Sequence, residues 1–213
     1  MSYPAYTRAE RIADGVIHVT GVAAALVAIS YLIDRVAAFA GTGIYTAIVV
    51  YAICLLAMLS ASAAYHLAAD TRARPLLRRL DHAAIYMKIA GTITPLSVFL
   101  GTAFGYAVLG VVWIVAALGA LTKLRMKRGR MTTGWVQYMA LGWVGIALFI
   151  PLMNVLPGFS LWTMALGGAL YCAGVVFYGW ENLRYSNAIW HGFTLAASAC
   201  FFAGIATALP ATG

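Results

Sequence analysis

Charged side chains are scarce in this chain of 213 residues: Asp, Glu, Lys and Arg together make up 9%. Soluble domains carry about 25% charged residues and are about 45–50% apolar, whereas 63% of this chain is hydrophobic. A soluble domain of this length has too little interior to bury so much apolar surface. The shortage of charge therefore excludes a soluble enzyme, a disordered chain and a coiled coil, and it predicts an integral membrane protein.

Cysteine and acidic residues are also rare. The three cysteines lie apart within apolar stretches and form no CxxC pair, so neither a disulfide framework nor a thiol site is expected. Six acidic residues stand against fourteen basic ones, which lie between apolar runs. No motif of a nucleic-acid reader accompanies them, so no nucleic-acid partner is expected. The polar first residues do not resemble a cleavable signal peptide, and none is expected.

Seven apolar segments are long enough to cross a bilayer as helices, which takes about 20 residues each. Charged residues, glycine or proline bound every one of them. The expected spans are residues 13–33, 43–66, 82–101, 104–122, 133–152, 158–179 and 188–209. The connections are too short for a soluble domain. The sequence thus predicts an all-α, seven-transmembrane helix bundle in which residues 1–213 form a single domain.

Basic residues collect in the connections on one side of these spans. Arg35 is alone on the opposite side, and Lys88 lies within a span. Because cytoplasmic loops are enriched in Lys and Arg, we expect a cytoplasmic N-terminus and a C-terminus outside. The remaining twelve basic residues form the cytoplasmic set: Arg8, Arg11, Arg72, Arg74, Arg78, Arg79, Lys123, Arg125, Lys127, Arg128, Arg130 and Arg184.

Ionisable residues inside a membrane bundle are costly and usually face its interior. All four histidines are expected near the cytoplasmic ends of spans, and Asp14 and Asp81 at the same depth. Three polar pairs share a helix face at a spacing of four residues. The histidines are His18, His66, His82 and His191, and the pairs are Asp14 with His18, Ser62 with His66, and Asn187 with His191.

Imidazole and carboxylate groups that converge from separate helices suit zinc. Such a site with one open position would activate a water molecule. Plainer interpretations exist: each histidine can be a hydrogen-bonded interfacial side chain, and Asp14 and His18 can form a pair at the membrane surface. Asp81 can favour the N-terminus of the third helix, or pair with Lys88 two turns further along.

The order of these motifs resembles the hemolysin III family. That family is similar to a bacterial branch of the progestin and adipoQ receptors, within a superfamily that includes alkaline ceramidases. The resemblance covers essentially the whole chain and implies the bacterial cytoplasmic membrane as its location. It is carried by Glu-Arg-Ile-Ala-Asp-Gly-Val-Ile-His at 10–18, Ser-Ala-Ala-Tyr-His at 62–66, Arg-Leu-Asp-His at 79–82 and Ser-Asn-Ala-Ile-Trp-His at 186–191.

The resemblance implies an intramembrane zinc site. His66 and His191 would be zinc ligands, Asp81 would bind the metal or hold the water beside it, and Ser62 would support it. One position departs from the family pattern, because Asn187 stands where the first histidine of His-x-x-x-His is expected. Two histidines with Asp81 can still make three ligands, and His18 can add another. The metal can equally be weakly bound, different from zinc, or absent.

Three functions are compatible with this site. The first is an enzyme that hydrolyses an amide or ester of a membrane lipid, with Asp81 and Ser62 as catalytic residues, similar to the activity proposed for the superfamily. The alternative is a receptor-like sensor or regulator of membrane state, with a lipid as its ligand. A pore is disfavoured, because polar groups should line a conducting path throughout its length and the outer halves of these spans are apolar.

Overall fold

A computed structural model describes residues 7–38, 40–68, 71–126, 134–180 and 182–209. The described chain is helical, and seven helical segments are long and apolar enough to cross a membrane, which confirms the predicted fold class. Lys127, Arg128 and Arg130, part of the expected cytoplasmic set, lie outside the described residues. The helices are α1 Arg8–Ala37, α2 Thr42–Leu67, α3 Arg74–Leu100, α4 Ala103–Arg125, α5 Trp135–Val144, α6 Ile146–Leu152, α7 Gly158–Gly179 and α8 Ser186–Ala208.

Several helices, α1 among them, extend a few residues beyond the expected spans, and two spans differ more from the structure. The third helix begins at Arg74, eight residues earlier than expected, because the Arg-rich segment before Asp81 continues the helix beyond its apolar part. Asp81 therefore lies two turns inside α3 and does not open it. The fifth span is divided at Gly145 into α5 and α6, which together are long and apolar enough to cross a membrane.

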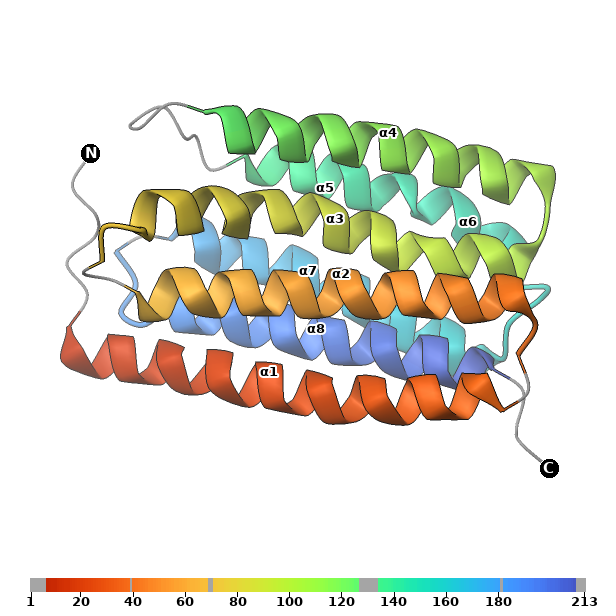
Figure 1. The fold of residues 1–213 in the computed structure, drawn as a ribbon, viewed down its shortest axis with the longest axis horizontal. Coiled ribbons are helices and arrows are strands. Elements are labelled where there is room, and N and C mark those ends of the chain that lie inside the picture. The colour runs from red at the N-terminus through yellow and green to blue at the C-terminus, as the bar shows by residue number, and fades with distance from the viewer. Residues whose placement is uncertain (1–6, 39, 69–70, 127–133, 181, 210–213) are drawn as a thin grey trace.

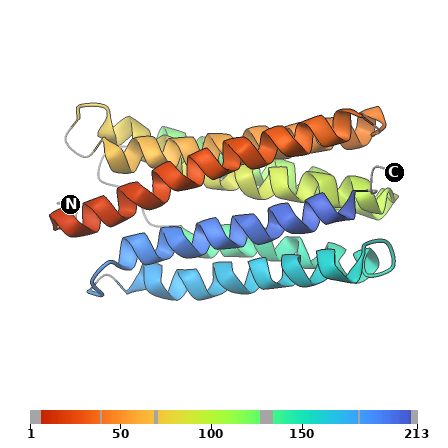
Figure 2. The same cartoon turned by 90° about the horizontal axis from the view of Figure 1, so that it is seen from below.

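The helices run side by side, and the start of α1 and the end of α8 lie at opposite ends of the bundle (Figure 1). We call the end that holds the start of α1 the N-terminal end. The closest packing joins α2 with α3, α3 with α4, and α7 with α8. Helix α1 runs obliquely across α2 and α8 and contacts both (Figure 2). It thereby connects the α7–α8 pair to the remainder of the bundle.

The α2–α3 contact depends on a glycine. A Cβ atom placed on Gly91 would lie 2.5 Å from the Cβ and 2.9 Å from the Sγ of Cys54. We expect Gly91→Ala to lower the free energy of unfolding by about 1–3 kcal/mol, because the packed helices must separate. The control is Gly110→Ala on α4, where nothing lies within 4 Å.

Thermal unfolding in detergent would measure both variants. Adding Cys54→Gly should restore stability to Gly91→Ala by returning space to the contact. If Gly91→Ala unfolds at the same temperature as the wild type, this packing is not as tight as the structure indicates.

Candidate metal centre

Three helices bring four metal-ligating side chains together near the N-terminal end of the bundle. Asp14 and His18 lie on one face of α1, His66 is in the last turn of α2, and His191 is in the second turn of α8. One potential ligand atom from each lies within 4.8 Å of those of the other three. Asp14 and His18 are only 7% and 5% exposed. The plainer interpretation of Asp14 and His18 as a pair at the membrane surface is therefore wrong.

The carboxylate of Asp14 is the centre of this group. Its Oδ1 lies 2.7 Å from Nδ1 of His191, and its Oδ2 lies 2.9 Å from Nδ1 of His66. The side-chain amide of Asn187 also donates to Oδ2, at 3.1 Å. One carboxylate thus connects α1 to α2 and α8 through contacts with three side chains.

His18 completes the group from the face of α1 one turn further along. Its ring lies 4.8 Å from the ring of His66 and 4.4 Å from that of His191, measured between centroids. Nε2 of His18 is 3.7 Å from Oδ1 of Asp14. This buried nitrogen has no hydrogen-bond partner among the described residues. A buried polar atom without a partner is costly, unless a ligand takes its lone pair.

These residues fit a divalent metal ion. Imidazole nitrogen and carboxylate oxygen are the ligand types that zinc accepts, usually in a set of four. A neutral imidazole has a lone pair on one ring nitrogen, which is the atom that binds a metal. Nε2 of His18 has no hydrogen-bond partner among the described residues and is therefore available for that role. The group could therefore bind a metal ion, as its residues and spacing allow.

Asn187 orients the ligand group. Its side-chain nitrogen lies 3.1 Å from Oδ2 of Asp14 and 3.2 Å from Nδ1 of His66, so the amide lies between two of the potential ligands. Tyr185, which precedes α8 with a φ of 62°, places its backbone N–H 3.0 Å from Oε1 of Glu10 on α1. This hydrogen bond fixes the start of α8 against α1 and so sets the position of His191 along the bundle.

Ser62 and Asp81, the expected catalytic residues, are both buried and line the same cavity. Asp81 is not among the four residues of the ligand group, and the structure shows no hydrogen bond or ion pair between its carboxylate and another described residue. The expected ion pair with Lys88 is not formed, because the Lys88 amine reaches Tyr171 on α7. Asp81 as a ligand or base stays a prediction.

His82 lies apart from the ligand group although it follows Asp81. Its Nδ1 is 3.2 Å from the hydroxyl of Tyr138, which in turn donates to the backbone carbonyl of His82 at 3.2 Å. These contacts attach α5 to α3. The sequence places all four histidines at one depth. Only the fold shows that three of them converge and that His82 does not.

Asp14 is the residue that sequence reasoning undervalued as a ligand. Its spacing of four from His18 was the available signal, since the two residues must share a face of α1. Nothing in the sequence shows that this face turns towards α2 and α8. That orientation follows from the oblique packing of α1, which depends on contacts between distant segments.

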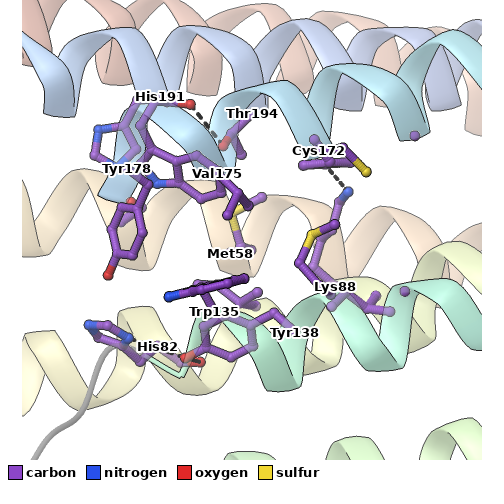
Figure 3. A pocket seen from close by; sticks show the side chains of 18 of the residues that line it. Met58, His82, Lys88, Trp135, Tyr138, Cys172, Val175, Tyr178, His191 and Thr194 are labelled. Carbon is purple, nitrogen blue, oxygen red and sulfur yellow. Dashed lines mark hydrogen bonds between the residues drawn. The ribbon is translucent and has the colours of Figure 1, made fainter. Parts of the chain in front are cut away.

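A cavity of about 1570 Å³ extends from the ligand group into the bundle. It follows one face of α3 from Arg74 to Leu96, which corresponds to roughly 33 Å along the helix. Side chains from α3, α5, α7 and α8 enclose it, including His82, Trp135, Tyr138 and His191 (Figure 3). Its polar residues are concentrated near the N-terminal end, and Ile93, Leu96 and Phe149 are among those lining the far part.

Comparison with known proteins agrees with the motifs. The family model for haemolysin-III related proteins matches residues 6–202. The hemolysin-3 homolog of Bacillus subtilis strain 168 is 31% identical over 199 residues, which is 92% of this chain and 93% of that protein. Hemolysin-3 of Bacillus cereus is 31% identical over 194 residues, or 91% and 89%. The chain is a multi-pass membrane protein that belongs to the hemolysin III family.

Proposed function

We propose that this protein is a zinc-dependent hydrolase of an amide or ester bond in a membrane lipid. The observation that carries the proposal is that a potential metal-ligand group opens into a large, mainly apolar cavity within the bundle. Pockets for small molecules usually measure about 300–1,000 Å³, and this one has about 1570 Å³. The combination of ligand group and cavity suits a substrate with one reactive polar bond and a long apolar chain.

The ligand group supplies the residues that would hold the ion: His18, His66, His191 and the Asp14 carboxylate. Zinc bound there would provide Lewis acidity, which polarises a carbonyl oxygen and makes a nearby water more acidic. Asn187 keeps the Asp14 carboxylate in place through its amide nitrogen. The choice of zinc follows from the three imidazoles, because calcium and magnesium prefer sites made of oxygen ligands.

Asp81 is the residue that can move the proton. A carboxylate Oδ of Asp81 takes a proton from the attacking water, whose oxygen bonds to the carbonyl carbon of the lipid. The same proton then passes to the nitrogen or oxygen of the leaving group as that bond to carbon breaks. The Ser62 hydroxyl, one turn before His66, donates a hydrogen bond to the reacting polar group. The products are a fatty acid and an amine or an alcohol.

Location and orientation complete the proposal. The twelve basic residues of the expected cytoplasmic set favour an N-terminus in the cytoplasm, and the family resemblance favours a bacterial cytoplasmic membrane. The ligand group then lies near the inner leaflet, where the cavity receives a membrane lipid as its substrate. Arg11, Arg74 and Arg78 line the cavity at this end, close to the expected depth of lipid headgroups.

Turnover by the purified protein tests the proposal. Zinc-loaded protein in liposomes should release fatty acid from lipid amides or esters, detected by mass spectrometry, and His191→Ala or a chelator should abolish the release. His82→Ala, which removes a histidine outside the ligand group, is the matched control and should retain zinc. Release that continues after chelation would contradict metal-dependent hydrolysis.

A receptor-like sensor is the second candidate, and one specific observation favours it. The Asp14 carboxylate already connects α1, α2 and α8 through three side-chain contacts, which is the arrangement of a structural connection. In this case a lipid in the cavity would alter the relative positions of the helices and no bond would be broken. Metal-loaded protein that binds lipids but releases no product would favour the sensor.

A further inference from the structure

Lys88 is a buried cation in the middle of α3, at 5% exposure. Its side chain extends from α3 across the cavity towards α7, beside Cys172 (Figure 3). The amine donates to the hydroxyl of Tyr171 and lies 4.3 Å from the centre of the Tyr171 ring and 5.6 Å from that of Phe201. These neighbours are neutral. A charge within a membrane bundle is rare, and it usually marks a functional pathway or binding site.

The donors and acceptors in the hydrogen bonds around Lys88 can be assigned. Ser198 donates its only hydroxyl proton to the carbonyl of Thr194 at 2.8 Å, so Ser198 accepts from Tyr171, whose oxygen is 2.8 Å away. The Tyr171 oxygen therefore accepts from Lys88. An ammonium group has three N–H donors, and this chain of hydrogen bonds uses one. No acceptor for the other two is found among the described residues, and Lys88 lines the cavity.

No carboxylate of a described residue lies within ion-pair distance of Lys88. The acidic residues that line the cavity, Glu10, Asp14 and Asp81, belong to its N-terminal end. Asp81 is seven residues before Lys88, or about 10 Å along the axis of α3. A buried charge of this kind is costly without a partner, and interaction with aromatic rings offsets only part of the cost. The site lacks a negative charge that a ligand could bring.

The walls beyond Lys88 indicate what else such a ligand contains. Further along the cavity face of α3 lie Ile89, Ile93 and Leu96, and Phe149 and Met164 lie among the lining residues on α6 and α7. From Lys88 to Leu96 this apolar stretch measures about 12 Å. We infer that the cavity binds a long-chain carboxylate, whose carboxylate accepts from the Lys88 ammonium while its chain lies along the apolar far part.

This site differs from the metal centre in position and in chemistry. The inference goes beyond the proposed hydrolysis and does not require it, since Lys88 and the apolar walls lie outside the metal-ligand group. A neutral lipid of equal length has the apolar contacts but no charge to pair with the ammonium. The carboxylate should therefore bind more tightly than the matching alcohol by about tenfold to a hundredfold.

Binding of dodecanoate and of dodecanol to chelator-treated protein tests the inference, with native mass spectrometry at about pH 8, where a carboxylate is ionised. Lys88→Met keeps the length of the side chain and removes its charge, and Lys88→Arg keeps the charge. Removal of an unpaired buried charge does not destabilise the bundle, so Lys88→Met should melt at or above the wild-type temperature. Because the protein is metal-free, the binding result does not depend on whether the hydrolase proposal is correct.

We expect the wild type to prefer dodecanoate, Lys88→Arg to keep that preference, and Lys88→Met to lose it while binding dodecanol as before. Tyr171→Phe should weaken dodecanoate binding less than Lys88→Met, because the ammonium remains. The inference is overturned if Lys88→Met binds dodecanoate as tightly as the wild type. It is also overturned if the wild type binds dodecanol as tightly as dodecanoate.

Discussion

The Asp14→Ala variant is expected to lose bound metal and to unfold more easily than the wild type. The substitution removes one ligand and leaves the nitrogens of His66, His191 and Asn187 without their common acceptor. Each buried donor that is left without an acceptor costs about 1–3 kcal/mol, so the free energy of unfolding should fall by at least that amount. Substitution of a residue that only supports a metal ligand lowers metal affinity by up to about a hundredfold. Asp14 is itself a potential ligand, so its loss should lower the affinity by at least that factor.

Asp34→Ala is the matched control for this prediction. Asp34 lies on the same helix, near its other end, and is exposed. Thermal unfolding in detergent and metal titration of both variants would provide the comparison. We expect Asp34→Ala to behave as the wild type does in both measurements. Equal stability and equal metal affinity of Asp14→Ala and Asp34→Ala would show that Asp14 is not the centre of the group.

The Asp81→Asn variant is expected to keep its metal and to lose turnover. Asparagine has the shape of aspartate but cannot accept a proton from water at neutral pH. Loss of a general base typically lowers kcat by about 10²- to 10⁴-fold. Because Asp81 lies outside the ligand group, we expect the metal content and the melting temperature to change little.

Measurement of turnover and metal content on the same preparation separates the roles open to Asp81. Asp81→Glu keeps a carboxylate and should recover part of the activity lost in Asp81→Asn. Loss of metal from Asp81→Asn would identify Asp81 as a ligand, the role that the family resemblance also allows. Turnover equal to that of the wild type would exclude Asp81 as the base.

Most of the fold could be predicted because membrane insertion depends on local sequence. Runs of about 20 apolar residues define spans, and the seven expected segments correspond to helices in the structure. The predicted bounds are wrong where a helix continues beyond its apolar segment or is interrupted within it. Helix α3 begins at Arg74 because an Arg-rich segment can stay helical beyond the apolar run, and the fifth span divides at Gly145, where no apolar pattern changes.

The candidate site could be predicted only in part. Spacing of four residues identified His66 with Ser62 and His191 with Asn187, because such pairs share a helix face. The convergence of Asp14 and His18 with these histidines depends on how α1 crosses α2 and α8, and no local pattern encodes that crossing. The partner of Lys88 could not be predicted from local sequence either. The expected partner, Asp81, lies on the same helix, whereas the partner in the structure, Tyr171, lies on α7.

Metal content of the purified protein, measured by elemental mass spectrometry, tests the central claim most directly. We expect about one zinc ion per chain, lost in both His66→Ala and His191→Ala and retained in His82→Ala, whose ring contacts Tyr138 instead. A stable wild-type protein that contains no metal after expression with zinc, and that neither substitution alters, would contradict the account. The Asp14 group would then be a hydrogen-bonded connection between helices.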